Sequence, residues 1–236
     1  MEFNKHISKL KKKAVIFMLL LLLSFVSIAI AIEAFVLKST LWGCFLGLFI
    51  CIVICLVFFY KNEYSLKEGL ILKPFEIQIN HTIKYAEVYS ALEKSCNSNE
   101  CFKFSERSAF FRLKNKYNVR VILYGTAEFN KKDYDEEKKK VNRKANKTYN
   151  ISQWVSVHQS RKQMRINLIY TDCVNKCLSD YIAEDAEILL TRVEGIINLV
   201  VSNGKLIVPP LKPTFYMYAI DRYKDMVTMI YNILSE

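Results

Sequence analysis

The chain has 236 residues, a net charge of +11 and an apolar content of 52%. This length suits one or two domains, and its 6 glycines and 4 prolines argue against long flexible linkers and low-complexity tracts. The apolar residues are unevenly spread, because Leu, Ile, Val and Phe crowd into residues 14–60. The composition therefore predicts a membrane segment followed by an ordinary globular domain.

Two stretches without any charge lie near the N-terminus, at residues 14–32 and 41–60. A helix rises about 1.5 Å per residue, so each stretch would span about 30 Å, the thickness of the hydrocarbon core of a bilayer. A cleavable signal peptide is the alternative for the first stretch, but its apolar core is too long and a second stretch follows directly. We therefore expect residues 1–60 to form a basic tail and a transmembrane hairpin of two helices.

The flanking charges predict the orientation of this hairpin. Five lysines precede the first stretch, the short loop after it carries only Glu33 and Lys38, and further lysines follow residue 60. Cytoplasmic flanks are enriched in Lys and Arg, so both termini are expected in the cytoplasm of a multi-pass protein of the inner or plasma membrane. The basic flanks would contact anionic lipid headgroups, with a gain of about 1 kcal/mol per Lys or Arg.

Gly43 and Gly47 stand four residues apart in the second stretch. Small residues at this spacing let two membrane helices approach closely. The first helix of the same chain is the expected partner, and the alternative is self-association with the hairpin of a second copy.

The remaining chain is predicted to hold a connector at residues 61–79 and a cytosolic mixed α/β (α+β) domain at residues 80–236, with a small sheet of four or five strands. Strands are expected at 119–124 and 165–171, and a helix that starts at Asp133 lies between them, which favours a parallel crossover. Asn203-Gly204 separates two short apolar runs and predicts a hairpin with a type I′ turn. Helices are expected from Asn80, at 177–198 and at 215–234.

Four of the seven cysteines lie outside the apolar stretches: Cys96, Cys101, Cys173 and Cys177. A cytosolic domain disfavours disulfides. Cys173 and Cys177 are one helical turn apart, so with the other two they could form a tetrahedral zinc site. The two-residue spacing of a zinc knuckle is missing, so we expect free thiols and no cofactor, with zinc as the alternative.

Candidate ligand-binding residues are few. Arg192 and Glu194 interrupt an apolar stretch and could hold a phosphate or pair with their neighbours, and Arg161 lies close to His158. A catalytic His158 would need a carboxylate to orient it, and none is adjacent.

Acidic residues could support a metal-dependent reaction only where strands end, at Glu128 and Asp172. No phosphate-binding loop, dinucleotide turn or metalloprotease motif is present. The lysine-rich stretch 131–147 is typical of a solvated helix, so nucleic acid is not an expected partner.

These observations predict a non-enzymatic sensor or regulatory protein that is anchored in the membrane and binds a small ligand or protein partner in the cytosol. One alternative is a membrane-disrupting effector whose hairpins assemble into a homo-oligomer when the cytosolic domain senses its ligand. Another is a membrane-tethered hydrolase that acts on an anionic substrate, a nucleotide or nucleic acid.

Overall fold

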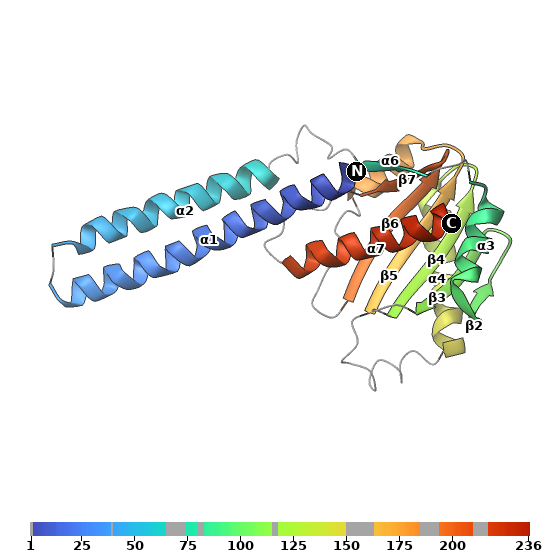
Figure 1. Cartoon of the computed structure of the whole chain (residues 1–236), viewed down its shortest axis with the longest axis horizontal. Coiled ribbons are helices and arrows are strands. Elements are labelled where there is room, and N and C mark those ends of the chain that lie inside the picture. The colour runs from blue at the N-terminus through green and yellow to red at the C-terminus, as the bar shows by residue number, and fades with distance from the viewer. Residues whose placement is uncertain are drawn as a thin grey trace. The chain divides into compact units, whose positions relative to one another are not determined.

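The computed structural model describes residues 2–38, 40–64, 74–79, 83–114, 118–149, 163–184, 194–209 and 217–236. The chain divides into two compact units. The first comprises Met1–Ile71 and Pro213–Ile220, and the second comprises Leu72–Lys212 and Asp221–Glu236. The two long N-terminal helices belong to the first unit and the whole sheet belongs to the second (Figure 1).

The first unit contains α1 (Glu2–Val36) and α2 (Trp42–Tyr64), which pack side by side. Among the described helices, α1 alone is long and apolar enough to cross a membrane. The described apolar part of α2, Trp42–Phe58, is shorter than the ~20 residues of a full span. The structure thus supports one long apolar helix, and the second span stays a prediction.

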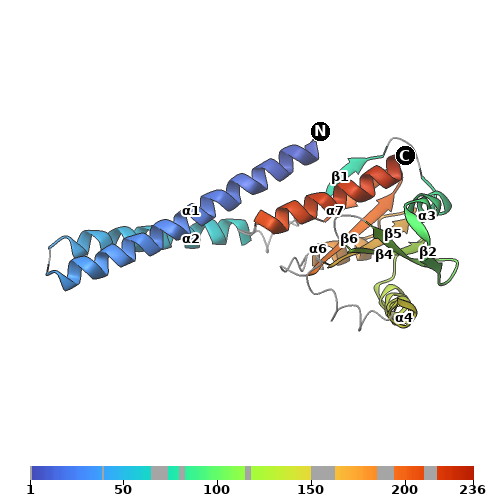
Figure 2. The same ribbon diagram turned by 60° about the horizontal axis from the view of Figure 1, so that its bottom comes forward.

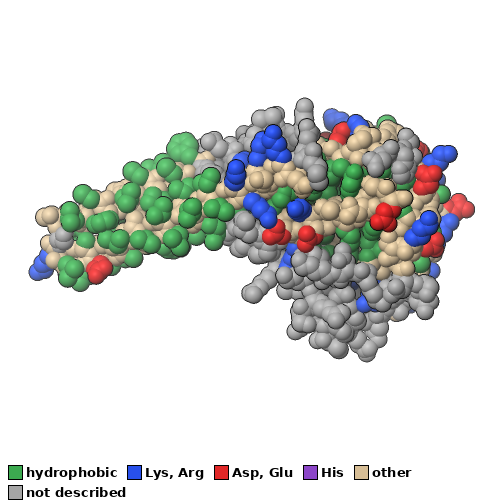
Figure 3. Space-filling view, viewed as in Figure 1, with side chains coloured by type: hydrophobic (Ala, Val, Ile, Leu, Met, Phe, Trp, Pro, Cys, Tyr) green, Lys and Arg blue, Asp and Glu red, His purple; other side chains and the backbone are tan. Residues whose placement is uncertain are grey.

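The surface of α1 and α2 is apolar from Val15 to Phe58. Figure 3 shows apolar side chains gathered over these two helices, and every large apolar side chain that is exposed in the described residues lies between Val15 and Phe58, except Val174. The buried Ser24 and Ser27 hydroxyls donate hydrogen bonds to carbonyl oxygens one turn earlier, at 2.7 and 3.0 Å. Polar groups satisfied within their own helix are compatible with a hydrocarbon environment.

The second unit is built around a sheet of seven strands, not the four or five that the sequence predicted. The strand order is β1-β7-β6-β5-β4-β3-β2, in which β4, β5 and β6 are mutually parallel and the other neighbours are antiparallel. Their bounds are β1 (Phe75–Gln78), β2 (Cys96–Lys103), β3 (Ser108–Lys114), β4 (Asn118–Thr126), β5 (Gln163–Thr171), β6 (Glu194–Ser202) and β7 (Lys205–Val208).

The additional strands lie toward the two edges of the sheet. β1 falls in the stretch expected to be a connector, and β2 has the polar sequence CNSNECFK, for which no strand was predicted. The pairing of β2 with β3 shifts register between Cys96 and Cys101. Edge strands are stabilised by hydrogen bonds to one neighbour and need not carry the apolar alternation on which a sequence prediction depends.

The helix predicted over residues 177–198 is confirmed only in its first part, by α6 (Lys176–Glu184). Residues 185–193 lie outside the described residues, and the prediction is wrong at 194–198, which belong to the interior strand β6. A parallel strand buried on both faces is a nearly continuous apolar run, which imitates a buried helix. The helix expected to start at Asn80 begins later, as α3 (Tyr85–Lys94) with Lys84 at its N-cap, and Asn80 lies outside the described residues.

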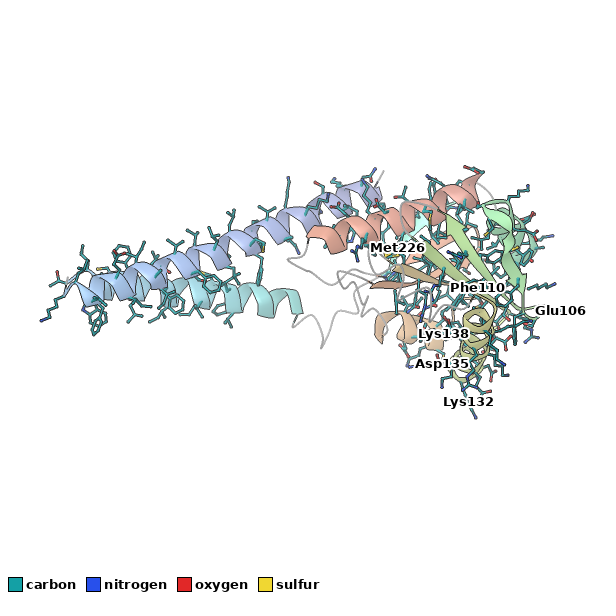
Figure 4. The ribbon with its side chains drawn as sticks, turned by 90° about the horizontal axis from the view of Figure 1, so that it is seen from below. Glu106, Phe110, Lys132, Asp135, Lys138 and Met226 are labelled. Carbon is teal, nitrogen blue, oxygen red and sulfur yellow. The ribbon has the colours of Figure 1, made fainter. Side chains whose placement is uncertain are left out.

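Helices cover both faces of the sheet, with α3 and α7 (Met217–Ser235) on one face and α4 (Lys131–Tyr149) and α6 on the other (Figure 2). Figure 4 shows Met226 of α7 on one side of the sheet, and Lys132 and Asp135 of α4 pointing outward on the other side. The apolar stripe of α4 is thin, as the sequence indicated: Tyr134, Val141 and Ala145 are buried.

Two predicted connections are confirmed. β4 and β5 pair in parallel with α4 between them. β6 and β7 form a hairpin in which Asn203 and Gly204 have φ angles of 49° and 71°, as a type I′ turn requires.

Candidate ligand-binding site

A pocket of about 430 Å³ lies at the carboxyl ends of the neighbouring parallel strands β4 and β5. This edge of a parallel sheet is the usual ligand site of α/β folds, and the volume falls in the range of small-molecule sites. Four segments supply its lining: Tyr85 at the start of α3, Glu106 and Arg107 in the β2–β3 turn, Gly125–Glu128 at the end of β4, and Tyr170 and Asp172 at the end of β5.

The two loops after β4 and β5 are fixed by side-chain hydrogen bonds. The buried Thr171 hydroxyl donates to the carbonyl oxygen of Ala127 at 3.1 Å. Asn175 caps α6 by accepting a hydrogen bond from the Leu178 amide at 2.9 Å, and its Nδ2 donates to the Phe129 carbonyl oxygen at 3.1 Å. The loops therefore hold each other in place and form a firm wall.

The β2–β3 turn forms another part of the lining and is tied to β4 and α4. The Gly125 amide donates to the Arg107 carbonyl oxygen at 2.7 Å. Ser105 and Ser108 both donate to Oε1 of Glu137 on α4, at 3.0 and 2.6 Å. Figure 4 shows Glu106 at this turn, beyond the ends of the strands.

Two tyrosines form the aromatic part of the pocket. Tyr85 and Tyr170 meet edge to face, with ring centroids 5.9 Å apart. The Tyr85 ring lies over Gly125 so closely that a Cβ atom added there would be 2.5 Å from Cδ2 of the ring. The Tyr170 hydroxyl donates to Oδ1 of Asp172 at 3.0 Å.

Both tyrosines hold their protons firmly. Burial, with a smaller effect from Tyr89, raises the pKa of Tyr85 to about 12. Burial raises the pKa of Tyr170, and the hydrogen bond to Asp172 adds to that increase. The Tyr85 hydroxyl is buried and has no hydrogen-bond partner among the described residues, so it is a protonated group that a ligand could engage.

The charges of the pocket favour a ligand with several hydrogen-bond donors. The lining contains three carboxylates, those of Glu106, Glu128 and Asp172, and a single guanidinium, that of Arg107. Carboxylates only accept hydrogen bonds when they are ionised. In the part of the chain that the structure describes, no group of three or more His, Cys, Asp or Glu side chains is placed to hold a metal ion.

Of the acidic residues that the sequence singled out, the structure brings Glu128 and Asp172 together in this pocket. His158, Arg161 and Arg192 lie outside the described residues, and Glu194 is the first residue of β6 rather than part of a helix. Sequence reasoning missed Tyr85 and Arg107, which reach the pocket from other segments.

The four thiols of the zinc alternative are not gathered in one place. Cys96 and Cys101 lie on β2, whereas Cys173 and Cys177 follow β5, and strands β3 and β4 stand between them. None of these four cysteines forms a disulfide bond.

Gly43 and Gly47 are not covered by α1. A Cβ atom added at either glycine would have no atom of the described residues within 4 Å. The expected contact with the first helix is therefore not made at these positions, and a role in packing against another molecule stays a prediction.

No protein-family model matches the sequence, and neither a curated protein nor a solved structure was found to resemble it. The class of the protein is therefore described by its structure alone, as a long apolar helix and a mixed α/β domain with a seven-stranded sheet.

Proposed function

We propose that the chain is a membrane-anchored sensor whose α/β domain binds a small, donor-rich polar ligand in the pocket at the ends of β4 and β5. The observation that carries this proposal is the convergence of side chains from four separate segments on one cavity at the carboxyl edge of parallel strands. The proposed role is binding without catalysis. The sequence shows no motif that combines a nucleophilic side chain with a general base.

The membrane anchor in this proposal is the apolar pair α1 and α2, with both chain termini in the cytoplasm. The lysines at positions 5, 9, 11, 12 and 13 precede the apolar part of α1, and such charges remain on the cytoplasmic side. The α/β domain would then meet its ligand in the cytosol, and the helices would localise or transmit that event.

Replacing Tyr85 by Phe separates a binding role from a structural one. The substitution removes a buried hydroxyl that lacks a partner, so we expect the unliganded protein to be as stable as wild type or up to ~1 kcal/mol more stable. Ligands found by a thermal-shift screen of polyols, amines and nucleosides against the full chain in detergent should bind the variant at least about fivefold more weakly.

The raised pKa of Tyr85 adds an alkaline signature to this test. The folded state holds the proton more tightly than the unfolded state, so this contribution to stability is complete below pH 10 and is lost as the pH rises from about 10 to about 12. The free energy of unfolding of wild type should therefore fall relative to that of Tyr85→Phe across that interval.

The control variant for these measurements is Lys132→Gln on the exposed surface of α4. A pocket that binds no compound, or equal affinities for wild type and Tyr85→Phe, would contradict the assignment.

A second candidate is the membrane-disrupting effector, which is favoured by the position of Gly43 and Gly47. The α2 side chains that are partly covered include Phe45, Phe49 and Ile52, and at 100° per residue the two glycines lie on the opposite side of the helix. Backbones can approach closely along such a surface, so the glycine face could pack against α2 of another copy.

Gly47→Ile tests this assembly without disturbing the chain itself, because the space around Gly47 is open. If hairpins assemble through this face, we expect dye leakage from cells expressing the chain under inducing conditions to fall to background in Gly47→Ile. Leu48→Phe adds volume about 100° around the same helix at an exposed position, and should leak like wild type. Leakage that is absent in wild type, or unchanged in Gly47→Ile, would rule out this candidate.

A further inference from the structure

Three arginines form a row across the sheet, on the face that α4 covers. Arg112 of β3 is the register partner of Arg120 of β4, and Arg120 is the partner of Arg165 of β5. Phe110 and Ile122, two residues away on β3 and β4, pack against Val141 and Ala145 of α4, and side chains two apart on a strand share a face. The three guanidinium groups therefore emerge side by side from adjacent strands.

The row concentrates positive charge in a small, partly covered area. Neighbouring strands lie about 4.8 Å apart, so three strands place these arginines within about 10 Å of each other. All three are half-buried. Like charges directly opposite each other on adjacent strands destabilise a sheet unless other groups compensate them. Arg112 and Arg120 each interact with other groups of the chain.

Arg165 at the end of the row is the most informative of the three. No hydrogen bond or ion pair is found for its side chain within the residues that the structure describes. Its strand is central, and no described residue supplies a counter-charge, so a phosphate from outside would compensate this cation.

The next layer of the same face is also polar. Asn167, two residues from Arg165, is completely buried and donates from Nδ2 to Oδ1 of Asn198 on β6 at 2.6 Å. Its own Oδ1 has no partner among the described residues. A buried acceptor without a donor calls for a hydroxyl, an N–H group or water.

From this arrangement we infer a second binding site, in which Arg112, Arg120 and Arg165 hold the phosphate group of an anionic ligand. Guanidinium groups bind phosphate oxygens through paired, charge-assisted hydrogen bonds. Each guanidinium has five N–H donors, so an arginine that already has a partner in the chain can still bind a phosphate oxygen. A hydroxyl or N–H group on the phosphate carrier would donate to the side-chain Oδ1 of Asn167. The site is distinct from the carboxyl-edge pocket, because Arg120 and Thr126 are six residues, or about 20 Å, apart along β4.

The phosphate can come from a soluble compound or from a lipid headgroup, and two arms of one experiment separate these sources. Titration calorimetry of the full chain in phosphatidylcholine nanodiscs, with pyrophosphate and ATP as probes, measures soluble phosphates. Flotation of the same nanodiscs with vesicles containing phosphatidic acid, with and without pyrophosphate as competitor, measures headgroups. Saturable binding in either arm supports the site and identifies its source.

The variants test whether the row carries the binding. We expect Arg165→Gln to weaken binding about tenfold or more and Arg165→Lys to weaken it less, because a lysine keeps the charge and loses the planar fork. Lys132→Gln, which removes an exposed charge from α4, should bind like wild type. Without phosphate, Arg165→Gln should melt at the same or a higher temperature than wild type, because it removes like-charge repulsion.

Three results would overturn the site: no saturable binding in either arm, equal affinity in Arg165→Gln and wild type, or a melting temperature several degrees lower for Arg165→Gln in phosphate-free buffer. The last result would show that Arg165 is held by a structural ion pair. None of these results depends on the pocket at the carboxyl edge, so the experiments test the two proposed sites independently.

Discussion

Tyr134→Ala is expected to lower the free energy of unfolding of the α/β domain by about 3–5 kcal/mol, the usual cost of deleting a buried aromatic side chain. Tyr134 is only 1% exposed and lies at the centre of an aromatic cluster. Its ring centroid is 5.3 Å from Tyr124, 5.5 Å from Phe129 and 5.5 Å from Tyr181. The alanine variant loses these ring contacts and leaves a cavity that the surrounding strands and helices cannot fill.

Urea denaturation of the full chain, followed by tyrosine and tryptophan fluorescence, measures this loss. Lys138→Ala is the matched control on the same helix. The Lys138 ammonium lies 5.2 Å from the Tyr134 ring centroid, and its removal should cost at most ~1 kcal/mol. If Tyr134→Ala cost no more than the control, the aromatic cluster would not be the centre of this side of the core.

The cluster matters for the proposed pocket because it joins the elements that carry it. Tyr124 belongs to β4, Phe129 to the loop that follows β4, and Tyr181 to α6. The Asn175 side chain bonds to the Phe129 carbonyl oxygen, so a shift of Phe129 would reach both loops at the carboxyl edge. Loss of Tyr134 should therefore weaken ligand binding as well as stability.

The elements that could be predicted from the sequence are those with strong local patterns. The β-branched run that ends at Gly125 became β4, and the residues from Asp133 became part of α4. Asn203-Gly204 defined the β6–β7 hairpin by its turn chemistry alone. In each case a few neighbouring residues restrict the backbone enough to decide the structure.

The elements that were missed depend on residues far away in the chain. β2 carries no apolar alternation, and its conformation comes from pairing with β3. β6 is apolar on both faces because helices cover both sides of the sheet. The sequence of residues 194–202 alone does not show that these helices are there. Its similarity to a buried helix could be resolved only by knowing its neighbours.

The residues of the candidate sites likewise divide into those that a local sequence pattern predicts and those that depend on distant parts of the chain. Glu128 and Asp172 could be found because acidic residues after two parallel strands must meet at one edge. Tyr85 and Arg107 could not, since they arrive from α3 and the β2–β3 turn. The arginine row did leave a signal: Phe111-Arg112-Leu113, Val119-Arg120-Val121 and Met164-Arg165-Ile166 each place one arginine between apolar neighbours. Only the register of the sheet shows that the three belong together.

Gly125→Ala should destabilise the α/β domain by about 2 kcal/mol, because the added methyl group meets a ring that is already in contact. Its Cβ atom would stand 2.5 Å from Cδ2 and 2.6 Å from Cε2 of Tyr85, well inside van der Waals contact. Overpacking of this kind costs about 1–3 kcal/mol when neighbours must move. Tyr85 is held in place by its contact with Tyr170, so the ring cannot turn aside freely.

A double-mutant cycle identifies the clash as the cause. In a Tyr85→Ala background the ring is gone, so Gly125→Ala should cost less by about 1–2 kcal/mol than it does in wild type. Gly204→Ala is the control, because its cost arises from a φ angle of 71° in the β6–β7 turn and should be the same in both backgrounds. Equal costs of Gly125→Ala with and without Tyr85 would contradict the contact. The absence of a side chain at residue 125 is what allows Tyr85 to lie across the end of β4, so the same glycine permits the aromatic wall of the pocket.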